Sequence, residues 1–130
     1  MVVGVGVDAV QISSMRRLLE TGGDTFETAT FSGEERRAAH VQSDAAARFA
    51  GLFAVKEAVY KALAPRAGKE DFDLRKVRVE HRADGSPHVV VDGYLSSIME
   101  RAGACSVLVS VTNEGDFAMA IALAQTEPLA

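Results

Sequence analysis

The sequence predicts an α+β fold in which helices pack on one side of a mainly antiparallel sheet. Strand-like and helix-like segments follow one another in the order β-α-α-α-β-β-α-β-β. The later strand-like segments come in pairs joined by short turns, which is typical of antiparallel hairpins rather than of parallel βαβ units. We expect one domain over residues 1–130, because domains of about 100 to 150 residues are the most common.

The chain begins with a strand and a helix. Residues 2–8, VVGVGVD, are rich in β-branched residues, which predicts a buried strand with Asp8 at its C-terminal end. The pattern leaves open whether this strand pairs in parallel or antiparallel. Residues 12–20, ISSMRRLLE, place apolar side chains at helical spacing, and the glycines at 22–23 predict the end of that helix.

Two more helices are expected before the middle of the chain. In residues 31–40, FSGEERRAAH, Ser32 precedes Glu35 by three positions, which is the capping-box pattern and gives Glu35 a structural role. The longest helix should begin at Asp44, a good N-cap, and run to Leu63, because Pro65 lacks a backbone donor.

The second half of the chain predicts two hairpins around a short helix. The dipeptide Asp84-Gly85 lies between two strand-like runs and is a strong hairpin signal. The expected elements are RKVRVEH at 75–81, HVVVDG at 88–93, the helix YLSSIMERAG at 94–103, CSVLVSV at 105–111 and FAMAIALA at 117–124.

The composition is that of a folded protein with a mildly acidic balance. Hydrophobic residues make up 48% of the chain, charged residues 25%, and the net charge is -4. This charge argues against nucleic-acid binding, which depends on clustered lysines and arginines. The local pairs at 16–17 and 36–37 fit a small anionic ligand or an acidic protein partner, or they are solvated helix faces.

The cysteine content and the N-terminus indicate a cytoplasmic protein without a membrane segment. Cys105 is the only cysteine and lies in an apolar run, so we expect a buried, inert thiol and no disulfide. The N-terminus lacks a basic region and reaches Asp8 too early for a signal peptide, and no apolar run approaches about 18 residues.

Three charged residues of the long helix could carry chemistry. Glu57 and Lys61 lie at the border of the apolar stripe, where they could form an ordinary i,i+4 pair. Lys56 falls within the stripe, so it must extend to water, pair with a carboxylate or face another subunit. Alternatively, the two lysines neutralise a phosphorylated ligand while Glu57 holds a divalent ion, and Asp8 is then the best second carboxylate.

Five segments in register resemble the holo-[acyl-carrier-protein] synthase family, the small 4'-phosphopantetheinyl transferases. They are GVGVDAVQI at 4–12, FSGEERR at 31–37, FAVKEAVYKAL at 53–63, DGSPHVVVDG at 84–93 and VSVTNEGDFAMAIAL at 109–123. The resemblance spans nearly the whole chain. It implies the phosphopantetheinyl transferase fold and a homotrimer with active sites between subunits.

The resemblance implies a transfer reaction. Family members move the 4'-phosphopantetheine arm of coenzyme A to a serine of an apo acyl carrier protein and release 3',5'-ADP. Asp8 and Glu57 match the Mg²⁺ carboxylates, and Lys61 matches the lysine that stabilises the transferring phosphoryl group. Glu57 or a metal-bound water would accept the serine proton.

The resemblance also assigns coenzyme A and carrier contacts. The first helix is the docking surface for the acidic carrier protein, which assigns Met15, Arg16 and Arg17 to this partner. The residues assigned to coenzyme A are Arg48, Phe53, Lys61, Ala64, Gly85, Ser86, Pro87, Thr112 and Asn113.

Three positions depart from the family pattern. Leu52 replaces an arginine, which Arg48 one turn earlier could supply; Ala64 replaces a glycine; and Asn113 replaces a histidine. Asparagine forms hydrogen bonds but does not titrate near neutrality. These departures motivate an alternative: a catalytically degenerate homologue that binds coenzyme A or a carrier protein. A domain excised from a multidomain synthase is a further alternative, although the early first strand favours a standalone protein.

Overall fold

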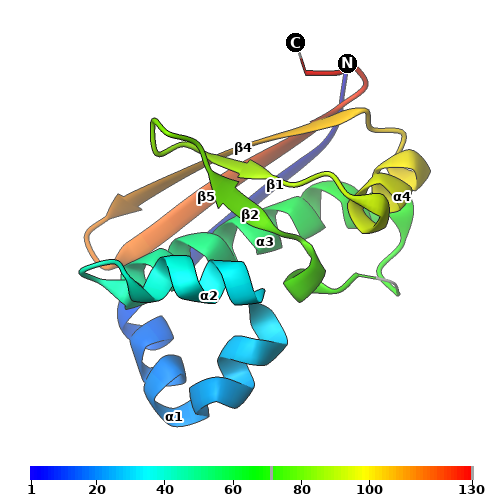
Figure 1. Ribbon diagram of the computed structural model, residues 1–130. Coiled ribbons are helices and arrows are strands. Elements are labelled where there is room, and N and C mark those ends of the chain that lie inside the picture. The colour runs from blue at the N-terminus through cyan, green and yellow to red at the C-terminus, as the bar shows by residue number, and fades with distance from the viewer. Residues whose placement is uncertain (71, 130) are drawn as a thin grey trace.

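Helices cover one face of a three-stranded antiparallel sheet, and a small hairpin flanks them (Figure 1). The computed structural model describes residues 1–70 and 72–129. The elements are β1 (Val2–Gln11), α1 (Ile12–Thr30), α2 (Gly33–His40), α3 (Ala45–Ala67), the 3-10 turn η1 (Leu74–Lys76), β2 (Val79–His81), β3 (Pro87–Val89), α4 (Gly93–Ala102), β4 (Ser106–Glu114) and β5 (Phe117–Gln125). The predicted α+β class and the order of elements are confirmed.

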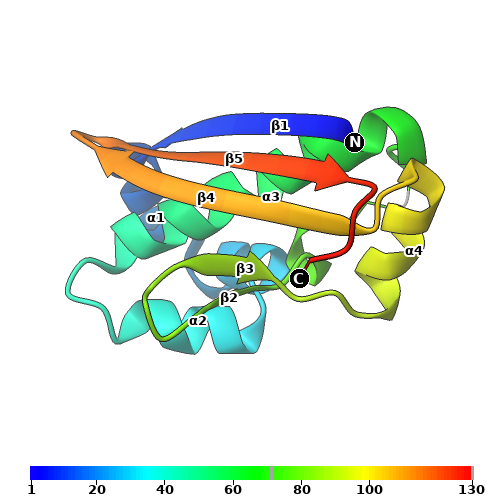
Figure 2. The ribbon, with the colours of Figure 1, turned by 90° about the horizontal axis from the view of Figure 1, so that it is seen from above.

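The main sheet has the strand order β1-β5-β4, and both pairings are antiparallel (Figure 2). β1 therefore pairs with β5 in the antiparallel sense, and Asp8 lies opposite Ala120. β2 and β3 form a separate two-stranded sheet. β3 is shorter than predicted, since it spans only Pro87–Val89.

The β2–β3 hairpin turns at the predicted Asp84-Gly85 dipeptide. The Arg82 backbone N–H donates to the Ser86 carbonyl over 2.9 Å, so three residues form the connection. Gly85 adopts φ 87°, a left-handed conformation that glycine reaches without strain. Such three-residue connections with glycine in this conformation are a common alternative to two-residue turns.

Helix α3 is buried between the sheet and the smaller elements, and its N-cap Asp44 accepts a hydrogen bond from the Ala47 N–H over 3.1 Å. The predicted end at Leu63 is wrong, because the helix continues through Pro65 to Ala67. Pro65 lies in the last turn, where its missing N–H removes only one helical hydrogen bond. Gly68, the cap residue that follows the helix, adopts φ 96°.

Glycines in β1 allow α3 to lie unusually close to the sheet. A Cβ on Gly6 would lie 1.8 Å from the Ala58 carbonyl oxygen, and one on Gly4 would lie 1.9 Å from that of Ala62. The β5 residues on this face are all small and buried, namely Ala118, Ala120, Ala122 and Ala124. This close contact sets the distance between Asp8 on β1 and the charged side chains of α3.

The predicted stop at Gly22-Gly23 is a kink rather than an end. Gly23 has φ 53° and ψ -146°, and helical structure continues to Thr30. Phe31 then lies in the core, where the centroid of its ring is 4.8 Å from the centroid of the Phe49 ring.

The prediction of a buried thiol is wrong, because Cys105 is exposed. It lies just before β4, where its backbone N–H donates to Gln125. None of the helices in the described part of the chain is both long and apolar enough to cross a membrane.

Candidate active site

Asp8, Glu57 and Lys61 come together where α3 crosses β1. The Lys61 Nζ lies 3.0 Å from Asp8 Oδ1 and donates to the Val7 carbonyl over 3.0 Å. Asp8 does not end its strand as predicted, since β1 continues to Gln11. Its side chain instead shares the α3-facing side of β1 with Gly4 and Gly6, because alternate residues of a strand face the same side.

The environment of Glu57 indicates a second carboxylate nearby. Burial raises the pKa of Glu57, the charge of Asp8 raises it further, and Lys61 opposes both effects. The alternative of a Glu57–Lys61 ion pair is wrong for this structure, because Lys61 pairs with Asp8 and, among the described residues, Glu57 forms no ion pair.

Two mutually repelling carboxylates fit a divalent cation. The described residues include no group of three or more metal-binding side chains, so the protein would supply only Asp8 and Glu57. Mg²⁺ is commonly held by one or two carboxylates together with phosphate oxygens and water. The donor set therefore fits a cation that binds together with a phosphorylated ligand.

Two further predicted residues lie on the same flank of α3. Phe53, Glu57, Lys61 and Ala64 are separated by four, four and three positions, which places them within one stripe of a helix with about 100° per residue. Phe53 is half-buried, whereas Ala64 is buried. Ala64 can therefore offer a ligand only a small area of surface.

Lys56 has a structural role, and the expectation that it neutralises phosphate is wrong. Its side chain is 0% exposed, and Nζ lies 2.9 Å from Glu35 Oε1. The ammonium group also donates to the carbonyls of Leu74 and Val77 over 2.9 and 2.7 Å. Burial lowers the pKa of Lys56, and the Glu35 carboxylate opposes this effect. Of the three outcomes expected for Lys56, pairing is the one observed.

A cavity of about 230 Å³ lies on the other flank of α3. It contains three residues predicted to bind coenzyme A, namely Arg48, Pro87 and Asn113, and also Leu52. It further contains His81, whose Nδ1 lies 3.4 Å from Arg48 Nη1. The sequence analysis did not assign His81. The alternation of Val77, Val79 and His81 could have placed it on the inward face of β2.

Three more residues assigned to coenzyme A lie near this cavity without lining it, whereas Phe53, Lys61 and Ala64 lie on the opposite flank of α3. Thr112 precedes Asn113 on β4 and is exposed. Gly85 and Ser86 lie in the hairpin turn, where the Ser86 hydroxyl donates to Asp84 Oδ1 over 2.6 Å. This hydrogen bond, together with one from the Ser86 backbone, lowers the pKa of Asp84.

The two groups of predicted residues lie on opposite flanks of α3. Arg48 and Glu57 are nine positions apart, which corresponds to about 180° around a helix. Asp8 belongs to β1 and Asn113 to β4, and these strands are opposite edges of the sheet. The edges of three adjacent strands lie about 10 Å apart. Within one chain, α3 therefore separates the carboxylates of Asp8 and Glu57 from the Arg48 cavity.

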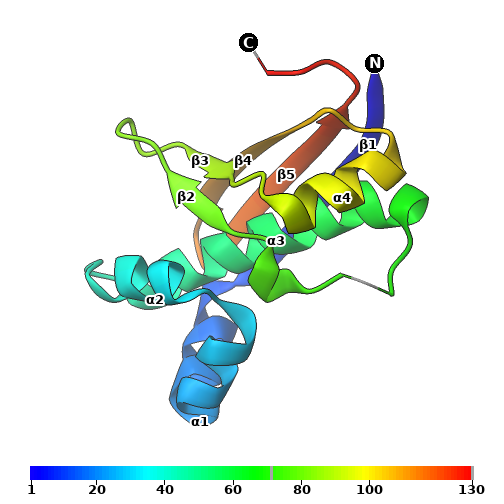
Figure 3. The same cartoon turned by 45° about the vertical axis from the view of Figure 1, so that its right-hand side comes forward.

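Helix α1 extends from the end of β1 away from the sheet (Figure 3). Arg16 lies 3.2 Å from Asp44, and Arg17 donates to the Ser14 hydroxyl over 3.2 Å; both arginines remain exposed. The expectation that Met15 contacts a partner is wrong for this structure, because Met15 is 1% exposed and belongs to the core. Leu18 is the exposed apolar residue beside the arginines.

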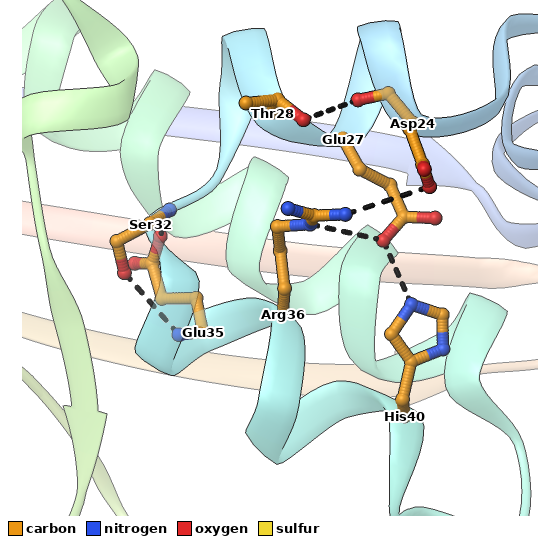
Figure 4. Close-up of polar contacts among 7 residues, drawn as sticks. All are labelled: Asp24, Glu27, Thr28, Ser32, Glu35, Arg36 and His40. Carbon is orange, nitrogen blue, oxygen red and sulfur yellow. Dashed lines mark hydrogen bonds and ion pairs between the residues drawn. The ribbon is translucent and has the colours of Figure 1, made fainter.

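A polar cluster fixes the second half of α1 against α2 (Figure 4). The buried Glu27 accepts from Arg36 Nε over 3.4 Å and lies 2.7 Å from His40 Nε2. Arg36 also lies 3.5 Å from Asp24. The capping box between Ser32 and Glu35 is present at the start of α2, as predicted.

The sequence profile of the 4'-phosphopantetheinyl transferase superfamily matches residues 4–122. The chain belongs to this superfamily. Among its relatives, the holo-[acyl-carrier-protein] synthase of Syntrophotalea carbinolica is 37% identical over 90% of this chain and 91% of its own. That of Anaeromyxobacter dehalogenans is 32% identical over 92% of this chain and 93% of its own. The predicted family is therefore confirmed.

Solved phosphopantetheinyl transferases share the fold. The holo-[acyl-carrier-protein] synthase of Neisseria meningitidis superposes with a TM-score of 0.83 at 26% identity, covering 96% of this chain and 99% of its own. The Mycobacterium tuberculosis acyl carrier protein synthase is 34% identical, with a TM-score of 0.70 over 95% of this chain and 96% of its own. A Chronobacterium ammoniagenes ACPS–CoA complex is 28% identical, with a TM-score of 0.77 over 95% and 97%.

Proposed function

We propose that this protein is an Mg²⁺-dependent holo-[acyl-carrier-protein] synthase. It transfers the 4'-phosphopantetheine arm of coenzyme A to a serine of an apo acyl carrier protein and releases 3',5'-ADP. One observation carries the proposal: Lys61 pairs with Asp8, whose charge also raises the pKa of Glu57, in a chain whose relatives are named holo-[acyl-carrier-protein] synthases.

The reaction breaks the phosphoanhydride bond of the coenzyme A diphosphate and forms a phosphate ester to serine. The serine oxygen bonds to the β-phosphorus of coenzyme A, the bond from that phosphorus to the bridging oxygen breaks, and 3',5'-ADP leaves with the electron pair. Asp8 and Glu57 would hold Mg²⁺, which stabilises charge on the diphosphate. Lys61 contributes a positive charge at the same place.

The serine proton needs an acceptor, and Glu57 is one candidate. In the metal-free protein, burial and the charge of Asp8 raise the pKa of Glu57, which favours proton uptake. A water molecule bound to the cation is the other candidate, as expected from the sequence. Phe53 and Ala64 would line the path of the ligand along this flank of α3.

Coenzyme A would also occupy the Arg48 cavity. Arg48 lies beside Leu52, which replaces the family arginine, so it can supply the missing guanidinium to a ligand phosphate. Gly85, Ser86, Pro87, Thr112 and Asn113 surround the adenosine end in this arrangement. The solved relative in complex with CoA supports coenzyme A as the substrate.

One ligand can reach both residue groups if a neighbouring subunit supplies one of them, which supports a homotrimer with active sites between subunits. The outer face of the main sheet is suited to such contacts. It exposes large apolar side chains, with Val7 61% and Ile121 40% exposed. The other members of this face are Val5, Leu108, Phe117 and Met119. An apolar face of this kind on a folded chain is typical of a subunit interface.

The carrier protein would dock on α1. Arg16 and Arg17 can attract its acidic surface, and the exposed Leu18 takes the apolar role expected of Met15. We place this reaction in the cytoplasm, where an exposed free cysteine such as Cys105 remains reduced. The carrier belongs to fatty-acid or polyketide synthesis.

Intact-mass measurement of an apo carrier after incubation with the protein, coenzyme A and Mg²⁺ tests this function. We expect the carrier to become heavier by one phosphopantetheine. Unchanged mass across fatty-acid and polyketide carriers would overturn the proposal. Coenzyme A binding without transfer would favour the second candidate, a binding homologue, which the replacement of the family histidine by Asn113 motivates.

A further inference from the structure

The Arg48 cavity contains a positive charge without a carboxylate partner. Within residues 1–70 and 72–129, Arg48 forms no ion pair, and its side-chain hydrogen bond is to His81. Asp44 lines the same cavity, but its carboxylate already pairs with Arg16 and caps α3. An anion entering the cavity would therefore meet a half-buried guanidinium that is not neutralised.

His81 faces Arg48 as a neutral imidazole. Because the guanidinium can only donate, Nδ1 of His81 accepts, and the ring proton lies on Nε2. Burial lowers the pKa of His81, and Arg48 and His88 lower it further. The other charged groups around it are Glu34 and Glu35 of α2, the α3 cap residue Asp44, Arg78 just before β2, and Glu80 of β2.

A phosphate group would change this arrangement. It offers several acceptor oxygens, so Arg48 no longer needs Nδ1 of His81 as an acceptor. The negative charge also offsets the repulsion between Arg48 and a protonated imidazole. Both nitrogens of His81 could then donate, one of them toward the phosphate.

We propose that His81 is a phosphate-binding residue of this cavity and that it takes up a proton when a phosphate of the ligand lies against Arg48. The proposal rests on the proposed coenzyme A chemistry and adds a residue and a pH dependence to it. Among the described residues that line the cavity, His81 is the only histidine. Asn113 lines the same cavity but cannot titrate near neutral pH.

The sign of the pH effect follows from proton uptake. Between the lowered pKa of free His81 and its higher value in the complex, binding consumes a proton, so the affinity increases as the pH falls. The ligand phosphate also titrates and acts in the opposite direction. The titration of the ligand phosphate affects wild type and His81→Gln equally. The difference in pH dependence of affinity between the two proteins therefore reports His81 alone.

The direct test follows the imidazole signal of His81 by NMR in the full-length wild-type protein, with and without 3',5'-ADP. We expect its titration midpoint to move to higher pH when the ligand is bound. Calorimetry in buffers of different ionisation enthalpy should show proton uptake by the wild type. Lowering the pH from about 8 to about 6 should change the affinity of the two proteins for 3',5'-ADP by different factors. The factor for wild type should be roughly five to ten times that for His81→Gln.

Dephospho-coenzyme A, which lacks the 3'-phosphate, shows which phosphate of coenzyme A lies against Arg48 and His81. Loss of the His81-dependent proton uptake with this ligand assigns the cavity to the 3'-phosphate, whereas retention assigns it to the diphosphate. His88→Gln is the comparison variant, since His88 lies on the adjacent strand outside the cavity. It also removes a group that lowers the pKa of His81, so the comparison is of proton uptake on binding and not of the titration midpoint of free His81. The His88→Gln protein should retain the proton uptake.

The outcomes separate this proposal from the proposed function. Ligand binding and transfer with an unmoved His81 titration, or with equal proton uptake in wild type and His81→Gln, would overturn the role of His81 alone. Absence of 3',5'-ADP and coenzyme A binding at every pH would overturn both. Because the NMR titration uses the wild type, it decides the question even if His81→Gln does not fold.

Discussion

Lys61 Nζ lies 3.0 Å from Asp8 Oδ1, although the two residues are 53 positions apart. The contact depends on the packing of α3 against β1 at Gly4 and Gly6, where no side chain separates the two backbones. The glycines of the first strand are therefore part of the site geometry, because they set how far Asp8 lies from the charged flank of α3.

Gly6→Ala should disturb both stability and activity. Its Cβ would lie 1.8 Å from the Ala58 carbonyl oxygen, so α3 and β1 must move apart. Overpacking of this kind destabilises by about 1 to 3 kcal/mol, and the backbone contact places the expected loss near the upper value. Displacement of Asp8 by about 1 Å should lower the rate of carrier modification by roughly 100-fold.

Gly51→Ala is the control for stability. Its Cβ would meet Val111 Cγ2 at 3.6 Å, an ordinary contact, and alanine favours a helix over glycine by about 0.5 to 1 kcal/mol. Urea unfolding of the two variants compares them directly. A Gly6→Ala protein with wild-type stability and rate would contradict the role of the glycine.

Glu57→Gln should be more stable than wild type near neutral pH while losing transfer activity. The folded-state pKa of Glu57 lies above its ordinary value of 4.5, so the folded protein binds this proton more tightly than the unfolded chain. Wild type therefore loses stability as the pH rises through this window, whereas an amide does not titrate. The difference between the two proteins should shrink as the pH falls below about 4.5.

Thermal unfolding at a series of pH values, without Mg²⁺, measures this difference. Addition of Mg²⁺ should stabilise wild type more than Glu57→Gln if the carboxylate binds the cation. Equal pH dependence in both proteins would show that Glu57 is not responsible for it.

The sequence predicted the fold class and the family, because these depend on local periodicity and on motifs that resemble a known family. It also placed Asp8 and Glu57 at one site, and the charge of Asp8 does act on Glu57, although the ion pair of Asp8 is with Lys61. It did not predict the partner of Lys56. Helical spacing placed Lys56 in the apolar stripe. The carboxylate that pairs with Lys56 belongs to α2, and the carbonyls that accept its hydrogen bonds belong to residues 74 and 77. Such contacts depend on tertiary packing, which a one-dimensional pattern does not contain.

The division of the site between two flanks was also outside the reach of sequence patterns. The motifs assigned Arg48 and Glu57 to one ligand, whereas helix geometry places them about 180° apart. Met15 illustrates the same limit. Its neighbours Arg16 and Arg17 are exposed, but Met15 lies on the buried face of α1 together with Ile12 and belongs to the core.

The buried pair of Lys56 and Glu35 should show strong energetic coupling. Lys56→Met leaves Glu35 buried without its cation, which should destabilise the protein by about 3 to 5 kcal/mol. Glu35→Gln combined with Lys56→Met removes both charges while the amide can still accept from Val79, whose N–H now donates to Glu35 over 2.8 Å. The double variant should therefore lose less stability than the sum of the single variants.

A double-mutant cycle by urea unfolding gives the coupling. We expect about 0.5 to 3 kcal/mol for residues in direct contact. If the two single substitutions change the free energy of unfolding additively, the Lys56–Glu35 ion pair contributes no stability beyond the separate hydrogen bonds of the two residues. The exposed pair of Arg16 and Asp44 serves as a comparison, since surface pairs contribute only about 0 to 1 kcal/mol.

The separation of Arg48 from Glu57 leads to a test of the proposal that the active site is shared between the subunits of a trimer. Arg48→Ala and Glu57→Gln should each be nearly inactive. If one site takes Glu57 from one subunit and Arg48 from its neighbour, mixed trimers of the two variants contain some sites with both native residues. Equal mixing and reassembly should then restore about one quarter of the wild-type rate, because each required residue is native in half of the subunits. If both residues act within one chain, every chain carries a defect and mixing restores no activity, which would refute the shared site even if the trimer forms.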